Sequence, residues 1–359
     1  MLSKGPLHGL LPSTARVAVI GASGYAGAEL LRLLSRHPRV RITAATANTS
    51  AGKPVSEIYP QLTTLGGLRF STLNIRQLGR QADVVFVALP PGESTEPVGR
   101  LLAGSACKVI DLGADFRLRD PRLYTQWYHW RHRRPQLLER SVYGLPEFNR
   151  SRIIEARLVA NPGCYPTAAL LGLGPLMRQA VIERNAPIII DAKSGLSGAG
   201  RSANPAFQLP EAQESVEAYQ LGTHRHTPEI EQELGLLAGR SCAITFIPHL
   251  VPMSRGLLAT IYVRLQRATT VAQLHRIYAA AYAGAPFIRI REGAANPRHV
   301  RATNYCEIGL AVVGRTRHAV ITSAIDNLGK GAAGQAIQNM NLMMEWPETM
   351  GIDFPGLIA

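Results

Sequence analysis

One cysteine of this chain of 359 residues has neighbours that favour chemistry over packing. Cys164 lies in the segment NPGCYPTA, directly before an apolar run. Pro166 suits the first turn of a helix, where its missing N–H costs nothing. The free amides and the dipole of a helix N-terminus lower the pKa of a thiol, and the thiolate is the nucleophile. We therefore expect Cys164 to be a nucleophile. The other cysteines lie in strand-like apolar stretches, which predicts structural roles for Cys107, Cys242 and Cys306.

A second segment, GTHRHTPE at residues 222–229, offers two imidazoles and a carboxylate to move the proton that thiol chemistry requires. Thr227 can cap a helix that has Pro228 at its first position. Glu229 then follows close enough to orient a histidine, as carboxylates do in nucleophile–base–orienter systems. A metal site is the alternative, because His-x-His is also a ligand spacing. No further cluster in the sequence completes a metal shell, so we predict none.

The segment GASGYAG at residues 21–27 stands between a predicted strand and a predicted helix. Its glycines allow a tight turn and a close approach of backbone amides to a pyrophosphate, whose charge the helix N-terminus favours. The spacing is not G-x-G-x-x-G, so the strand–turn–helix context carries the interpretation, and a purely structural turn is the alternative. The predicted cofactor contacts here are Gly21, Ser23, Gly24, Tyr25 and Gly27.

The end of the second predicted strand indicates which dinucleotide binds. NAD sites place Asp or Glu there to hold the ribose 2′-hydroxyl. In this chain no acidic residue occurs between Glu29 and Glu57. The stretch offers hydroxyls, an amide and a lysine, which suit a 2′-phosphate, and we predict NADP as the cofactor. The predicted contacts are Thr46, Asn48, Ser50 and Lys53.

A third loop, KSGLSGAGR at residues 193–201, follows another predicted strand. Its small residues let a loop pack closely against ligand phosphates, and Arg201 can grip an anion with two parallel hydrogen bonds. A flexible linker is the alternative. We expect Ser194 and Gly195 to contact the cofactor.

Two sheets must position these segments. Short apolar runs alternate with helical stretches up to about residue 112, which indicates a parallel sheet covered on both faces. Longer strand patterns from residue 187 onward, with a hairpin turn at 313–317, favour a mostly antiparallel sheet. The fold class predicted is α/β: a Rossmann-like dinucleotide-binding domain plus an α+β domain. The strands are expected at 16–20, 40–47, 83–89, 108–112, 187–192, 242–248, 257–265, 304–313 and 318–325, and helices at 26–35, 271–283 and 332–344.

Length and composition limit the architecture. At about 150 residues per domain the chain holds two domains. Its apolar content excludes a disordered chain. The sequence contains no run of about 18 apolar residues, so we predict no membrane-spanning helix. The N-terminus makes a poor signal peptide. We predict a leader without regular structure at 1–15 and an NADP-binding domain at 16–160, followed by a second domain.

Charge and cysteine usage narrow the partners. The chain carries 39 basic and 25 acidic residues, a net charge of +14, which suits an anionic cofactor, an acidic substrate or nucleic acid. The one dense basic cluster, at residues 131–134, is interpreted as a solvated loop with aromatic anchors rather than a nucleic-acid patch. Four cysteines without a Cys-x-x-Cys pair favour a reducing, cytoplasmic location.

Seven motifs, in order, make residues 16–357 resemble the N-acetyl-γ-glutamyl-phosphate reductases of the aspartate-semialdehyde-dehydrogenase-like superfamily. The motifs are GASGYAGAEL at 21–30, DLGADFRL at 111–118, VYGLPEFNR at 142–150, NPGCYPTA at 161–168, KSGLSGAGR at 193–201, HRHTPEIEQEL at 224–234 and AIDNLGKGAAGQAIQNMN at 324–341. One departure is the segment LPPG at 89–92, where members often carry a histidine.

The resemblance implies a reaction: NADPH-dependent reduction of an acyl phosphate to a semialdehyde and phosphate through a cysteine thioester, in arginine biosynthesis. It implies a homo-oligomer, a dimer or a tetramer. It also implies that residues 161–325 form a catalytic and dimerisation domain and that residues 326–359 return to the NADP-binding domain. It also implies roles for individual residues: Cys164 as the acyl acceptor, His226 as the acid and base with Glu229 as its partner, His224 near the substrate, Arg117 and Arg201 on anions, and Asn327 near the nicotinamide.

Two alternatives remain open from sequence. A sister reductase of lysine biosynthesis acts on an aminoadipyl phosphate, which an acidic carrier protein can deliver, and one methylene changes binding by only about 1–3 kcal/mol. A non-enzymatic NADP-sensing or nucleic-acid-binding protein is supported by the basic charge alone. The complete Cys164, His226 and Glu229 set argues against it.

Overall fold

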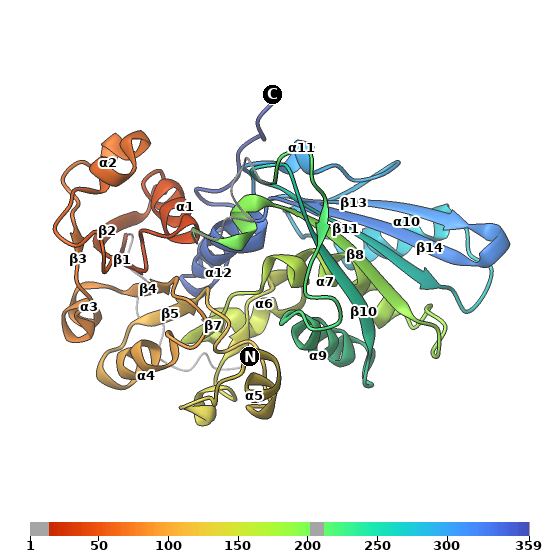
Figure 1. Ribbon diagram of the computed structural model, residues 1–359, viewed down its shortest axis with the longest axis horizontal. Helices are drawn as coiled ribbons and strands as arrows, with labels where there is room; N and C mark the ends of the chain where they lie inside the picture. Colours follow the sequence, from red (N-terminus) through yellow and green to blue (C-terminus); the bar gives the residue numbers. More distant parts are fainter. Residues whose placement is uncertain (1–13, 202–211, 359) are drawn as a thin grey trace, which may run out of the picture.

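The computed structural model describes residues 14–201 and 212–358. They form two seven-stranded sheets, one in each half of the molecule (Figure 1). Of the predicted leader, residues 1–13 lie outside the described ranges, and Ala15 already begins the first strand. No helix among the described residues is long and apolar enough to cross a membrane.

The first sheet is parallel throughout, with strand order β3-β2-β1-β4-β5-β7-β6. Its central strands are apolar and buried, as strands covered on both faces are: β4 is buried throughout, and β1 is buried except at Arg16 near its start. The strands are β1 (Ala15–Ile20), β2 (Val40–Thr46), β3 (Phe70–Ser71), β4 (Val84–Val87), β5 (Lys108–Asp111), β6 (Val142–Tyr143) and β7 (Leu158–Ala160).

Helices cover both faces of this sheet. One core lies between the sheet and α1, α6 and α12, and a second lies on the opposite face under α3, α4 and α5. The bounds are α1 (Tyr25–Leu34), α2 (Val55–Ile58), α3 (Ile75–Gln81), α4 (Thr95–Gly104), α5 (Arg122–Tyr128), α6 (Pro146–Glu155) and α12 (Gly334–Met343), with short 3-10 turns η1 (Pro60–Leu65) and η2 (Pro135–Leu137).

The second sheet has strand order β12-β13-β14-β11-β8-β10-β9. The pairs β12–β13 and β8–β10 are parallel, and the other neighbours are antiparallel. The strands are β8 (Ile188–Gly195), β9 (Glu217–Ala218), β10 (Ile244–Val251), β11 (Leu257–Arg264), β12 (Ile288–Arg291), β13 (Cys306–Val313) and β14 (His318–Ile325). The predicted fold class is confirmed.

One face of the second sheet packs against helices, while alternate side chains on the other face, such as Ile189 and Tyr262, are partly exposed. The covering helices are α7 (Cys164–Arg178), α9 (Thr227–Ala238) and α10 (Val271–Ala281). Helix α7 is buried along nearly its whole length because it packs against β11 and β14 of the sheet, against α9 and α10, and against the turn η6.

The chain crosses between the two halves twice. It leaves β7 and enters α7 within four residues, and after β14 it passes through a π-helical turn, η6 (Gly329–Ala333), into α12, which packs against α1 and α6 (Figure 1). Three further short elements are η3 (Leu196–Ala199), α11 (Pro297–Val300) and η5 (Gly314–Thr316), the last being the predicted hairpin turn between β13 and β14.

Candidate active site

A cavity of about 810 Å³ lies where the carboxyl ends of β1, β2, β4 and β5 face the start of α7 and the η3 turn. Open parallel sheets bind ligands at this edge, outside the carboxyl ends of their strands. The cavity is lined at one end by the glycine turn and at the other by Cys164 and His226. The nucleophile and the dinucleotide turn predicted from sequence therefore share one cavity.

The glycine turn is built for close approach of a phosphate. Gly21 has φ of +76°, and a Cβ there would stand 2.2 Å from the carbonyl oxygen of Ala88. A Cβ at Gly27 would stand 2.4 Å from the carbonyl oxygen of Gly21. Only glycine tolerates these positions, so the turn brings its backbone to the cavity directly before α1. The five residues predicted here all line the cavity: Gly21, Ser23, Gly24, Tyr25 and Gly27.

Of the four residues predicted at the end of β2 as cofactor contacts, two line the cavity and two do not. Thr46 and Asn48 line the cavity, and so does Thr49, which sequence reasoning missed. Ser50 and Lys53 do not line it. The chain turns away at this point because the N–H of Gly52 donates to the Phe70 carbonyl at 2.7 Å, and the N–H of Phe70 donates to the Lys53 carbonyl at 2.9 Å. The Lys53 side chain pairs with Glu57 at 3.1 Å instead.

The loop after β8 lines the cavity from Ser197 onward, rather than from Ser194 as predicted. Ser194 and Gly195 belong to β8 itself and do not line the cavity, because the β11 strand and the turn before it pack against them. Residues 197–201 line it instead. The Arg201 guanidinium lies at the phosphate turn, where it donates to the Ser23 carbonyl at 3.1 Å and to the Tyr59 hydroxyl at 3.3 Å.

Cys164 is the first residue of α7, as predicted, and is partly buried. Burial nevertheless raises the pKa of its thiol to about 11, although the Tyr165 N–H and the Arg117 charge both act to lower it. The expectation of a lowered pKa at this helix N-terminus is therefore wrong. Loss of solvation outweighs the amides here, and the resting side chain is an uncharged thiol.

His226 directly precedes α9, lines the cavity and is buried. Its ring lies beside the residue before the nucleophile, because a Cβ at Gly163 would stand 2.6 Å from Nε2. Burial, followed by the neighbouring His224 and Arg117, lowers the pKa of His226 well below its usual value. The imidazole is therefore neutral at pH 7 and can accept a proton.

Glu229 does not act as the predicted partner of His226. Its fully buried carboxylate accepts the Gly163 N–H at 2.9 Å and the Tyr143 hydroxyl at 2.8 Å, and it pairs with Arg117 at 3.3 Å. Nδ1 of His226 is buried and has no hydrogen-bond partner among the described residues. Glu229 lies one helical turn beyond His226, and its side chain reaches the chain before α7 rather than the imidazole. It fixes the backbone at the nucleophile.

His224 lies behind His226 rather than on the cavity wall. Its Nδ1 accepts the backbone N–H of His226 at 3.1 Å, and its ring makes edge contacts with Tyr165, Tyr219 and Phe246. Burial lowers the pKa of His224 to about 3. The side chain therefore supports its neighbour, and the place of His224 near the substrate stays a prediction.

Arg117 does line the cavity, next to Cys164 and His226. Its guanidinium also donates to the carbonyls of Asn161 and Leu112, both at 2.9 Å, which holds it rigidly between the carboxyl ends of β5 and β7. Arg225 lines the same end with an exposed side chain, and sequence reasoning missed it. Its position between the two histidines of the HRH motif was the available signal.

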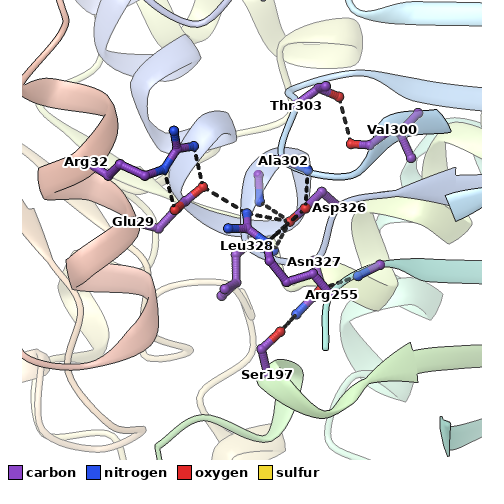
Figure 2. Close-up of polar contacts among 12 residues, drawn as sticks. Glu29, Arg32, Ser197, Arg255, Val300, Ala302, Thr303, Asp326, Asn327 and Leu328 are labelled. Atoms are coloured by element: carbon purple, nitrogen blue, oxygen red, sulfur yellow. Dashed lines mark hydrogen bonds and ion pairs between the residues drawn. The ribbon is translucent and has the colours of Figure 1, made fainter. Parts of the chain in front are cut away.

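Residues from the turn that follows β14 complete the cavity. Asn327 lines it as predicted, and its amide accepts the Gly256 N–H at 2.8 Å and donates to the Ser197 hydroxyl at 2.9 Å (Figure 2). Gly331 was missed. A Cβ on Gly331 would stand 2.8 Å from the Cβ of Cys164, so this glycine allows the π-helical turn to pack against the nucleophile.

Residues 14–201 and 212–358 contain no group of three or more His, Cys, Asp or Glu side chains that could hold a metal ion. Its donors are instead suited to an elongated anion: backbone amides at the glycine turn, hydroxyls and an amide at the end of β2, and arginines toward the thiol. Such a set fits a dinucleotide laid from β2 across the turn to Cys164.

Comparison with known proteins agrees with this fold. A family model described as semialdehyde dehydrogenase, NAD binding domain, matches residues 16–156, and one described as semialdehyde dehydrogenase, dimerisation domain, matches 164–327. Aspartate semialdehyde dehydrogenase II of Vibrio cholerae aligns with a TM-score of 0.70 at 18% identity, covering 93% of this chain and 99% of that one. The NADP complex of the Candida albicans enzyme aligns at 0.67 and 15%, covering 92% and 99%. The architecture is that of the semialdehyde dehydrogenases.

Relatives of higher identity define the family more narrowly. N-acetyl-gamma-glutamyl-phosphate reductase of Pelotomaculum thermopropionicum is 48% identical over 344 residues, and that of Moorella thermoacetica is 49% identical over 344 residues. Each alignment covers 95% of this chain and 99% of the relative. The chain belongs to the N-acetyl-gamma-glutamyl-phosphate reductase family, which confirms the resemblance drawn from its motifs.

Proposed function

We propose that this protein reduces N-acetyl-γ-glutamyl phosphate to N-acetylglutamate semialdehyde and phosphate with NADPH, as a step of arginine biosynthesis in the cytoplasm. The observation that carries the proposal is the single cavity in which the Cys164 thiol and the neutral His226 stand at the far end from a dinucleotide-binding glycine turn. The names of the relatives supply the substrate. The free cysteines are compatible with a reducing compartment.

The protonation states suggest how the covalent step runs. The Cys164 thiol gives its proton to the neutral His226 as its sulfur attacks the acyl carbon. Phosphate leaves with the electron pair of the acyl–oxygen bond, and a thioester remains on Cys164. A dinucleotide held along the glycine turn would supply the hydride that reduces the carbonyl of this thioester. Protonated His226 then returns its proton as the carbon–sulfur bond breaks, releasing the aldehyde and the free thiol.

Two positive charges at this end suit the substrate. Arg117 is buried and already paired with Glu229, so it contributes a fixed field near the leaving phosphate. Arg225 is exposed on the cavity wall and free to reach a substrate carboxylate or phosphate with two parallel hydrogen bonds. Arg201 belongs to the cofactor end, so we assign it to the dinucleotide phosphates rather than to the substrate.

NADP is proposed over NAD because the cavity wall at the end of β2 carries Thr46, Asn48 and Thr49 and no carboxylate. A carboxylate there would repel a 2′-phosphate. Self-association is proposed through the open face of the second sheet, where the partly exposed Ile189 and Tyr262 lie. The matching family model is described as a dimerisation domain, which supports a second copy of this chain as the occupant.

The test is a phosphate-dependent assay of NADP⁺ reduction, run in the reverse direction with N-acetylglutamate semialdehyde and with the aminoadipate homologue one methylene longer. We expect the shorter substrate to be preferred. Cys164→Ser should lose activity by orders of magnitude while NADPH binding is nearly intact, and Cys242→Ser should remain active. Preference for the longer or a carrier-bound substrate would move the protein to lysine biosynthesis. Substantial activity of Cys164→Ser would refute the covalent route.

A further inference from the structure

A chain of ion pairs between partly buried arginines and buried carboxylates crosses between the two domains outside the cavity (Figure 2). Glu29 lies on α1, directly after the glycine turn, and Asp326 directly follows β14 of the second sheet. Arg255, from the turn between β10 and β11, contacts both: Nη2 lies 2.8 Å from Oε1 of Glu29 and 2.9 Å from Oδ1 of Asp326. One guanidinium therefore joins the dinucleotide helix to the catalytic domain.

The contacts fix the orientation as well as the charge. Nε of Arg255 also donates to Oδ2 of Asp326 at 3.0 Å, which gives a bidentate pair. Arg32 holds the Glu29 carboxylate from its own helix through two hydrogen bonds of 2.8 Å. Burial raises the pKa of Glu29, but hydrogen bonds from Arg32 and Arg255 outweigh it and hold the pKa below its usual value. Both carboxylates are thus held by geometry and charge.

Asp326 passes this restraint to the nucleophile. It is fully buried, and Oδ1 accepts the N–H groups of Leu328 and Gly329, both at 2.8 Å, at the start of the π-helical turn. Its carbonyl accepts the N–H of Gly331 at 2.9 Å. Gly331 is the residue that packs against Cys164. The position of the Asp326 carboxylate therefore sets the wall behind the thiol.

The same turn places Asn327 against the cofactor end. Its amide accepts the N–H of Gly256, the residue after Arg255, at 2.8 Å. Arg255 and Gly256 thus hold both members of the Asp326–Asn327 pair from one short turn, with Arg255 also tied to α1. Arg255 therefore links the glycine turn, Asn327 and Cys164 through its contacts with Glu29 and Asp326.

We infer that Arg255 is a positioning residue that fixes the distance between the dinucleotide-binding domain and the thiol. It touches neither substrate nor cofactor, because it does not line the cavity. Its effect falls on the geometry of hydride delivery rather than on binding. The inference rests on the proposed function for its rate readout only.

The test uses two variants of the full chain. Arg255→Lys keeps a charge beside Asp326 but cannot span both carboxylates, and Glu29→Gln leaves the Arg255–Asp326 pair in place while removing the link to α1. Glu96→Gln is the matched control, since it removes an ion pair with Arg134 that lies within the first domain, and neither of these side chains lines the cavity. Because a displacement of about 1 Å can cost about a hundredfold in rate, we expect kcat to fall about ten- to a hundredfold in both test variants.

Three readouts separate positioning from folding and binding. We expect the KM for NADPH to stay near that of wild type, and the isotope effect on kcat with deuterated NADPH to increase, because hydride transfer becomes slower. NADP⁺ should also protect Cys164 from iodoacetamide less well in the variants than in wild type or Glu96→Gln. If Glu29→Gln fails to fold, Arg255→Lys decides alone.

The inference is overturned if both test variants that fold keep kcat and protection, or if KM rises in step with the loss of kcat. Inactivity of wild type toward N-acetylglutamate semialdehyde would refute the proposed function instead. The protection assay needs no turnover, so it would still decide the role of Arg255.

Discussion

The two ends of the cavity are built by different means. The dinucleotide end consists mainly of backbone and small side chains, contributed by the strand–turn–helix unit at residues 15–34, the end of β2 and the loop at 197–201. The thiol end depends on charged and titratable side chains from three separate segments: Arg117, Cys164, and the neighbouring His226 and Glu229. The first end depends on shape, and the second depends on protonation states that burial sets. Substitutions at the dinucleotide end should therefore weaken cofactor binding, and substitutions at the thiol end should lower kcat.

The largest expected effect concerns the thiol. An acid with a pKa of about 11 is protonated below that pH, and its ionised fraction rises tenfold per unit as the pH increases. Alkylation of Cys164 by iodoacetamide, followed by mass spectrometry, should therefore accelerate about a thousandfold from pH 7 to pH 10. Urea-unfolded protein is the control and should level off near the usual thiol pKa. A plateau below pH 9 in the folded protein would contradict the uncharged thiol.

A mirrored pair of glycine substitutions tests the comparison directly. In Gly163→Ala the new Cβ would stand 2.6 Å from His226 Nε2 and 2.9 Å from Arg117 Nη1, so one of them must move. We expect kcat to fall about a hundredfold with NADPH affinity near wild type. Gly27→Ala should do the opposite, weakening NADPH binding while leaving the alkylation profile of Cys164 unchanged. Fluorescence titration measures NADPH affinity, and steady-state kinetics measures kcat. If both variants lose equally in both assays, the two ends of the cavity do not have separate roles.

Glu229→Gln should give a smaller effect with a stability signature. The amide can still accept the Gly163 N–H, but Arg117 loses the only carboxylate paired with it among the described residues. Because hydrogen bonds between charged groups contribute about 1.5–3 kcal/mol, we expect the free energy of unfolding in urea to fall by that amount and kcat to fall about tenfold. Glu231→Gln on the same helix, where the carboxylate accepts the Ile244 N–H, is the control. Unchanged stability would show that Arg117 does not need this partner.

The smallest effect is expected at the end of β2. Asn48→Asp places a carboxylate where the wall now has an amide, and repulsion of about 1.4 kcal/mol would raise the KM for NADPH about tenfold. NADH should be used better by comparison. Asn48→Ala separates repulsion from a lost hydrogen bond. If Asn48→Asp leaves the NADPH-to-NADH ratio unchanged, the 2′-phosphate does not lie at this strand end.

Much of the fold was predictable because it depends on local patterns. The strand predicted at 83–89 is observed as Val84–Val87, and the one at 318–325 is observed as His318–Ile325. Continuous apolar runs identify buried strands wherever they lie. The parallel pairing of β8 with β10 was not predicted, because it depends on the long connection through α9 rather than on either strand.

The candidate site was predictable where backbone conformation decides it. The glycine turn follows from residue type alone, since only glycine fits Gly21 and Gly27. The thiol end was harder. The pKa of Cys164 and the partners of Glu229 depend on burial and on contacts with Tyr143 and Arg117, which are distant in sequence. Lys53 was predicted by type, and a backbone pairing with β3 turns it away.

Helix α7 gives the reaction centre a remote point of control. Two of its glycines, Gly172 and Gly174, abut Ile261 and Phe148, where an added methyl would stand 2.8 Å and 2.2 Å from the neighbouring side chain. At 1.5 Å of rise per residue these contacts lie roughly 12–15 Å along the axis from Cys164. An alanine at either position would have to displace the neighbouring side chain or the helix itself. Where the helix moves, substitutions at these glycines, which contact no ligand, would therefore change the position of the Cys164 sulfur in the cavity.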